Sequence, residues 1–195
     1  MRILCLASGR GSNFAAILSA CVERKITNCE VVGLISNVSD AMALDIARRA
    51  KIKTTVVDSN GFRAHGVFDR MAYEAALEDA IASYSPDLLC LTGYMLILGE
   101  RIINHYSGRI LNVHPSLLPS FKGLRAQKQA LTAGVKWTGC TVHYVESAVD
   151  SGKIIEQNVV RIEEGETEES LSQKLLPLEH EAYIRALRKI ALQIS

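Results

Sequence analysis

The chain has 195 residues, 48% of them apolar and 22% charged, and its 22 basic and 21 acidic side chains give a formal net charge of +1. This composition predicts one globular domain spanning residues 1–195, and the balanced charge gives no indication of a nucleic-acid partner. Because no apolar run reaches the length of a membrane span and the five cysteines form no C-x-x-C pair, we expect reduced thiols, no membrane association and a cytoplasmic location.

The first part of the chain alternates short apolar runs with longer amphipathic segments. We expect strands at 3–7, 31–36, 54–57, 88–91 and 110–114, and helices at 13–23, 41–50 and 67–84. Strands that alternate with helices are typical of βαβ units. The pattern therefore predicts an α/β fold with a Rossmann-like, mostly parallel twisted sheet flanked by helices.

The pattern changes after residue 135. Two strand-like runs, at 138–144 and 153–160, flank a short loop and predict antiparallel strands added to the sheet. A C-terminal helix follows, with Thr167 as its N-cap and two glutamates in its first turn. Proline removes a backbone donor and crowds the preceding turn, so we expect Pro177 to kink or split this helix.

A glycine-containing turn, Ser-Gly-Arg-Gly-Ser-Asn at 8–13, lies between the first strand and the first helix. Phe14 replaces the third small residue of a dinucleotide motif, and no Gly-Lys pair completes a Walker A motif. Two interpretations remain. The turn binds nothing, or it binds a phosphomonoester through the backbone amides of Gly11, Ser12 and Asn13 and the Ser12 hydroxyl.

Asn112 and His114 end the strand at 110–114, and side chains two positions apart share one face of a strand. Ligands of open α/β sheets collect at this carboxyl end. Asp150 lies in a loop ahead of a Ser-Gly pair, and a nearby carboxylate favours the protonated form of an imidazole. Such a ring, together with an amide, could stabilise the oxyanion of a tetrahedral intermediate. The alternatives are a structural histidine and an aspartate that only forms a turn.

Other catalytic arrangements are not evident. Ser116 lacks the G-x-S-x-G elbow, and Cys140 lies inside a strand-like run. His143 belongs to the same run, and we interpret it either as a strand residue or as a residue that supports the site without contacting the substrates. No spacing of histidine, cysteine and carboxylates suggests a metal site. Direct transfer of a group between two bound substrates is the simplest chemistry left.

Six segments resemble the phosphoribosylglycinamide formyltransferase family in their order and spacing. They are the turn at 8–13, TGYMLIL at 92–98, NVHPSLLPSFKG at 112–123, GCTVHY at 139–144, VDSG at 149–152 and Glu179-His180. The resemblance implies transfer of a formyl group from the co-substrate 10-formyltetrahydrofolate to the amine of 5'-phosphoribosylglycinamide in de novo purine biosynthesis. It implies small-molecule partners, no metal, and a monomer or homodimer.

The resemblance also implies roles for individual residues. His114 donates a proton or hydrogen bond to the intermediate, Asp150 keeps this imidazole charged, and Asn112 stabilises the oxyanion. Glu179 matches a substrate-side position facing the ribose hydroxyls. The contacts to formylfolate match the following residues: Arg70, Met95, Leu96, Ile97, Leu98 and Asn112. Some relatives have arginine at the position of Leu96, and plain core packing is the alternative role for residues 95–98.

Related functions stay open at this point. A deformylase would pass the formyl group to water, and such enzymes usually carry an extra N-terminal domain that we do not expect here. A transferase acting on aminoacyl-tRNA needs a basic surface and a C-terminal domain. A non-catalytic folate- or nucleotide-binding module is the third alternative, and the complete set of Asn112, His114 and Asp150 argues against it.

Overall fold

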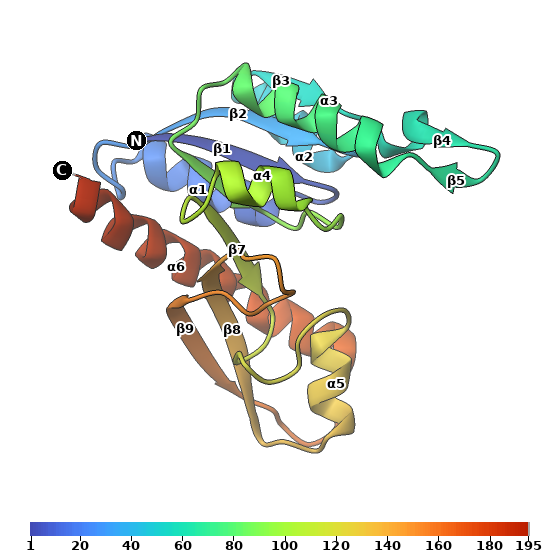
Figure 1. Cartoon of the computed structure of the whole chain (residues 1–195). Helices are drawn as coiled ribbons and strands as arrows, with labels where there is room; N and C mark the ends of the chain where they lie inside the picture. The colour runs from blue at the N-terminus through green and yellow to red at the C-terminus, as the bar shows by residue number, and fades with distance from the viewer. Residues whose placement is uncertain (195) are drawn as a thin grey trace.

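The computed structural model describes residues 1–194 and has a seven-stranded sheet at its centre (Figure 1). The strands lie in the order β3-β2-β1-β6-β7-β8-β9, and those up to β7 are parallel. The last two are antiparallel to their neighbours. This arrangement confirms the predicted α/β fold. The strands are β1 (Arg2–Ala7), β2 (Glu30–Ser36), β3 (Thr54–Val56), β6 (Leu88–Leu91), β7 (Ile110–His114), β8 (Trp137–Tyr144) and β9 (Ile154–Arg161).

Helices cover both faces of the sheet, and two separate cores lie beneath them (Figure 1). Ile3 and Cys5 of β1 pack with α1, α2 and α6, whereas Leu4 and Leu6 pack with α3 and α4. A strand that is buried on both faces has to be apolar throughout, which is why residues 3–7 form a continuous apolar run. The helices are α1 (Ser12–Val22), α2 (Met42–Arg49), α3 (Arg70–Ala82), α4 (Glu100–His105), α5 (Ala126–Thr132) and α6 (Glu168–Ile194).

The helix predicted at 67–84 is wrong at its beginning. Val67–Phe68 forms β5, which pairs with β4 (Arg63–Ala64) in a projecting hairpin after the short 3-10 helix η1 (Ser59–Phe62) (Figure 1). The Asp69 carboxylate accepts a hydrogen bond from the Ala72 N–H at 3.0 Å and so caps α3. Phe68 fits the apolar spacing of the predicted helix, but it lies in the hairpin and its ring packs on Tyr73 from outside the helix.

The sequence did not predict α4 and α5. These helices have six and seven residues, so neither is long enough for its apolar spacing to stand out. The residue before α5, Arg125, has a φ of +58° and makes no side-chain capping bond. The start of α5 therefore lacks the usual sequence signal of an N-cap.

Pro177 does not split the C-terminal helix, because α6 continues through it to residue 194. The predicted N-cap is confirmed, since the Thr167 hydroxyl accepts a hydrogen bond from the Ser170 N–H at 3.2 Å. Leu175 before the proline and Tyr183 after it are both fully buried. Packing along one face of α6 thus offsets the hydrogen bond that proline removes.

The strand register determines which polar residues meet at the carboxyl edge of the sheet. Asn112 of β7 lies beside Leu91, the last residue of β6, on one side. On the other side Asn112 pairs with His143 of β8, and His114 pairs with Thr141. The segments that follow β6 and β7 therefore leave the sheet next to each other.

The turn after β1 approaches α2 closely at Gly11. Gly11 has a φ of +77°, and a Cβ at this position would lie 2.6 Å from the Ala43 Cβ. Gly165 has the same φ with nothing within 4 Å. We expect Gly165→Ala to lower the free energy of unfolding by about 1–2 kcal/mol, the cost of a left-handed residue. Gly11→Ala should cost at least about 1 kcal/mol more because of overpacking. Urea denaturation measures both, and equal losses would contradict the close approach.

Candidate active site

The structure brings the three predicted catalytic residues together at the carboxyl end of β7. His114 Nδ1 lies 3.3 Å from Asp150 Oδ2, and these side chains are only 6% and 10% exposed. Asn112 lies two residues earlier on the same strand, with its Nδ2 3.4 Å from His143 Nε2. An amide and an imidazole–carboxylate pair thus stand side by side in a region largely shielded from water.

Both ring nitrogens of His114 face oxygen atoms that accept hydrogen bonds. Nδ1 faces the Asp150 carboxylate, and Nε2 lies 2.8 Å from the carbonyl oxygen of Phe121. A carbonyl and an ionised carboxylate can only accept, so each nitrogen has to carry a proton to form both hydrogen bonds. The His114 ring is therefore held in one orientation from both sides.

Asp150 is held as a carboxylate by several donors. Burial raises the pKa of this carboxyl, but hydrogen bonds from His143 and the Gly123 N–H, with the charge of His114, outweigh it and lower the pKa overall. The Gly123 N–H lies 2.8 Å from Oδ2. Asp150 adopts a φ of +48°, a left-handed conformation that aspartate tolerates better than most residues. The tight turn that carries Asp150 thus places a charged carboxylate next to His114.

His143 lies beside the site, in the supporting position that was one of two alternatives for it. Its Nδ1 donates to the Tyr144 carbonyl oxygen at 2.8 Å, which directs Nε2 towards the site. Nε2 lies 3.4 Å from Asn112 Nδ2 and 3.5 Å from Asp150 Oδ1. His143 is therefore the one described side chain that contacts both of these residues. His143 comes opposite Asn112 only through the register in which β7 pairs with β8. The antiparallel strands were predicted from the sequence, but their register was not.

The glycine turn is fixed by its neighbours and opens on the first turn of α1. The Ser8 hydroxyl accepts from the Met95 N–H at 2.8 Å and donates to the Asn37 side-chain oxygen at 2.5 Å. The Gly9 carbonyl accepts from the Ala43 N–H at 3.0 Å. Gly11 is the N-cap of α1 and supplies no side-chain cap, so the first N–H groups of the helix remain available to an anion.

Glu179 lies against this turn, a contact that the sequence analysis did not predict. The Asn13 side-chain amide donates to Glu179 Oε2 at 2.9 Å, although 166 positions separate the two residues in the chain. Burial raises the pKa of Glu179, and the hydrogen bond from Asn13 counteracts only part of this effect. The predicted phosphate turn and the predicted ribose contact are therefore neighbours in the structure.

Four of the predicted folate contacts line one cavity of about 260 Å³. Arg70 donates to the Ile97 carbonyl oxygen at 3.1 Å and pairs with Glu74 at 2.6 Å. Met95 and Ile97 are 67% and 62% exposed, so core packing does not explain them. Leu98 lies outside the cavity and is buried in the core beneath α3 and α4. The lining residues are Phe68, Arg70, Tyr73, Glu74, Met95, Leu96 and Ile97.

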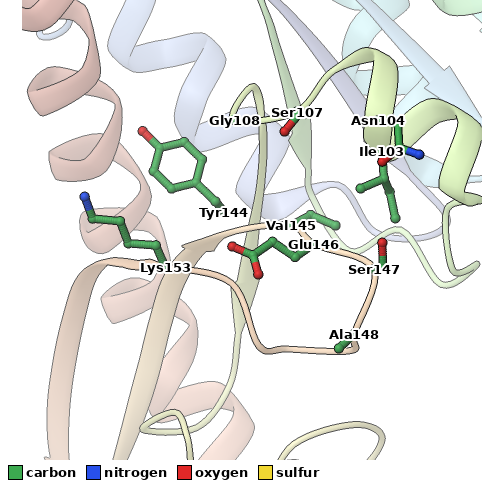
Figure 2. Close-up of a pocket in the computed structure, with 10 residues that line it drawn as sticks. All are labelled: Ile103, Asn104, Ser107, Gly108, Tyr144, Val145, Glu146, Ser147, Ala148 and Lys153. Carbon is green, nitrogen blue, oxygen red and sulfur yellow. The ribbon is translucent and has the colours of Figure 1, made fainter.

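A larger cavity, of about 580 Å³, contains none of the predicted site residues (Figure 2). Its walls come from the end of α4, the turn before β7, and the segment that follows β8. The segment after β8 continues to Asp150, so the cavity lies on the same loop as the catalytic carboxylate without including it. We assign the cavity no part in the reaction. The lining residues are Ile103, Asn104, Ser107, Gly108, Tyr144, Val145, Glu146, Ser147, Ala148 and Lys153.

The described residues contain neither a cluster of metal ligands nor a membrane-spanning helix. Within residues 1–194, no group of three or more histidine, cysteine and acidic side chains is arranged to hold a metal ion. In the same range, no helix is long and apolar enough to cross a membrane.

Residues 1–187 match the family described as formyl transferase, and the chain belongs to that family. Phosphoribosylglycinamide formyltransferase of Escherichia coli is 39% identical over 94% of this chain and 84% of its own length. Glycinamide ribonucleotide transformylase 1 from Symbiobacterium toebii has a similar structure, with a TM-score of 0.93 and 43% identity over 99% of this chain and 88% of its own.

Two further relatives differ in length or function. The trifunctional purine biosynthetic protein adenosine-3 of Chironomus tentans is 39% identical over 97% of this chain, which spans only 14% of that protein. A formyltetrahydrofolate deformylase from Pseudomonas syringae has a TM-score of 0.89 at 27% identity, over 98% of this chain and 61% of its own. The fold is therefore shared by proteins with different acceptors for the formyl group.

The lowered pKa of Asp150 makes its contribution to stability depend on pH. In the unfolded chain an aspartate has a pKa of about 3.9, so its contribution is fully present above that value. The contribution is lost as the pH falls through the lower pKa of the folded protein. We therefore expect acidification below about pH 4 to destabilise the wild type more steeply than Asp150→Asn. Urea denaturation at a series of pH values measures this, and parallel curves would show that the folded pKa is not lowered.

Proposed function

We propose that this protein transfers the formyl group of 10-formyltetrahydrofolate to the amine of 5'-phosphoribosylglycinamide in purine biosynthesis. The observation that carries the proposal is the buried pair of His114 and Asp150, 3.3 Å apart, next to Asn112 at the sheet edge. Family membership supports the formyl group as the transferred unit. The relatives named for glycinamide ribonucleotide support the acceptor.

The reaction proceeds through direct attack of one substrate on the other. The amine nitrogen forms a bond to the formyl carbon, and the carbonyl electron pair moves to the oxygen. The resulting tetrahedral intermediate loses a proton from the attacking nitrogen. The oxygen then re-forms its double bond, the bond between the carbon and N10 of the folate breaks, and N10 takes up a proton. Atoms and charges balance without any further reactant.

Asn112 and His114 stabilise the charge that develops on the formyl oxygen. The Asn112 amide is a neutral donor, and the His114 imidazolium is a charged one. Donors that are held in a buried site are well suited to stabilise an oxyanion. Because Nδ1 of His114 faces Asp150 and Nε2 faces the Phe121 carbonyl oxygen, Nε2 has to exchange this hydrogen bond for one to the formyl oxygen. Asp150 keeps the imidazole charged and oriented, and His143 holds the Asp150 carboxylate from its other side.

The two substrates approach from opposite sides of this centre. The phosphate of the acceptor binds the N–H groups of Gly11, Ser12 and Asn13 at the start of α1. The ring system of the folate lies along residues 95–97, in the cavity that Arg70 borders. Both partners are soluble small molecules, so a cytoplasmic location is part of the proposal.

Hydrolysis of the formylfolate is the second candidate, favoured by the likeness to a solved deformylase. Water needs no binding site for a phosphate or a sugar. Here the open N-terminal turn of α1 adjoins Glu179 through Asn13, which supports a phosphorylated acceptor with hydroxyl groups. We therefore prefer transfer over hydrolysis.

An assay with both substrates separates the two candidates. Purified protein is incubated with 10-formyltetrahydrofolate, with and without 5'-phosphoribosylglycinamide, and the products are followed by absorbance and by formate release. We expect formylation of the acceptor and little formate without it. Formate release at the same rate with and without the acceptor would identify a deformylase.

Replacing Asp150 tests the electrostatic core of the mechanism. Asp150→Asn keeps the size of the side chain but removes the charge that faces His114. We expect kcat to fall by at least about a hundredfold, with much smaller changes in the KM of either substrate. Asp45→Asn is the control, because Asp45 is an exposed aspartate that pairs with Arg48 on the surface of α2. Equal losses in kcat and in substrate binding would argue against an electrostatic role for Asp150.

A further inference from the structure

Asn13 and Glu179 form a partly buried contact between distant parts of the chain. Asn13 lies in the first turn of α1 and is 7% exposed, and its Nδ2 donates to Glu179 Oε2 at 2.9 Å. Glu179 belongs to the middle of α6, which packs against α1. A single side-chain hydrogen bond therefore joins the phosphate turn to α6.

Stability alone gives no reason for this pair. The Asn13 Oδ1 atom is buried and has no hydrogen-bond partner among the described residues. A buried acceptor without a donor destabilises the folded state, and so does a carboxylate taken out of water with only one donor. The arrangement is explained more readily if Glu179 has to be held in one orientation for a ligand.

The position of Glu179 follows from Tyr183, four residues later on the same face of α6. The Tyr183 hydroxyl lies 3.1 Å from the carbonyl oxygens of both Leu91 and Leu111. Leu111 directly precedes Asn112 in β7. Glu179 thus contacts the start of α1 and lies about one helical turn from the point where α6 contacts the strand that carries Asn112.

This is the region that the sugar of the acceptor has to occupy. If the phosphate binds at the start of α1 and the amine reaches the formyl group beside Asn112, the ribose lies between these two points. Its hydroxyl groups are hydrogen-bond donors, and an ionised carboxylate is a strong acceptor for them.

We propose that Asn13 is a positioning residue, whose side-chain amide holds Glu179 Oε2 so that the carboxylate accepts hydrogen bonds from the sugar hydroxyls of the acceptor substrate. This inference rests on the proposed function. Because the backbone N–H of Asn13 binds the phosphate while its side chain orients Glu179, one residue couples recognition of the phosphate to recognition of the sugar.

The test compares 5'-phosphoribosylglycinamide with its 2'-deoxy and 3'-deoxy analogues. Removing a hydroxyl that binds a carboxylate should lower kcat/KM of the wild type by about ten- to a hundredfold for at least one analogue. In Asn13→Ala, the kcat/KM values of the ribose substrate and of that analogue should differ by less than about threefold. The KM of the ribose substrate should rise, whereas kcat and the KM of the folate should change little.

Two further variants separate positioning from a general structural effect. Ser12→Ala weakens the phosphate site but should keep the full discrimination against the deoxy analogue. Glu179→Ala should lose the discrimination, and adding Asn13→Ala to it should cause no further loss, because the two side chains act as one unit. Additive losses would show that Asn13 does not act through Glu179.

Several outcomes would overturn the inference. A folded Asn13→Ala variant that still discriminates between the ribose substrate and the deoxy analogue would overturn it. A wild type that accepts both deoxy analogues as well as the ribose substrate would also overturn it. If circular dichroism shows that Asn13→Ala is unfolded, Asn13→Ser is measured by the same criteria. Calorimetric binding of the three acceptors requires no turnover, so it tests Asn13 even if the wild type transfers no formyl group.

Discussion

The site depends on one constraint, namely that a carboxylate and an imidazole are placed together where little water reaches them. A buried charge is costly unless partners surround it, and Asp150 has partners on both oxygens. Those partners come from three separate parts of the chain: β7 supplies His114, β8 supplies His143, and the loop before α5 supplies the Gly123 N–H. The antiparallel addition of β8 and β9 to the sheet is what brings them together.

The same edge of the sheet also gathers the glycine turn and the segment that borders the cavity beside Arg70. The carboxyl ends of β1, β6 and β7 lie in adjacent strands, so the segments that leave them adjoin one another. Ser8 links the turn after β1 to the segment after β6 by accepting the Met95 N–H. Tyr183 ties α6 to the end of β6 and to Leu111 of β7. The glycine turn, the cavity beside Arg70 and the group of Asn112, His114 and Asp150 are therefore parts of one connected framework.

Local sequence patterns predicted much of the fold and failed where packing outweighs them. The buried strands and the long helices were evident, because burial on two faces and the 3.6-residue period leave strong signals. The helix predicted at 67–84 begins too early. Phe68 lies in a hairpin, but its ring packs on Tyr73 and therefore fits the helical spacing of the sequence. Pro177 was expected to interrupt α6, but the buried face on both sides of it keeps the helix continuous.

The sequence by itself determined the α/β architecture, the glycine turn after the first strand and the placement of Asn112 and His114 on one strand face, because each of these depends on residues close together in the chain. Only the tertiary structure decided that Asp150 reaches His114, that His143 joins them and that Asn13 meets Glu179. It also excluded Leu98 from the folate cavity. Contacts between distant segments depend on strand register and helix packing, and a one-residue shift in register would turn His143 away from Asn112.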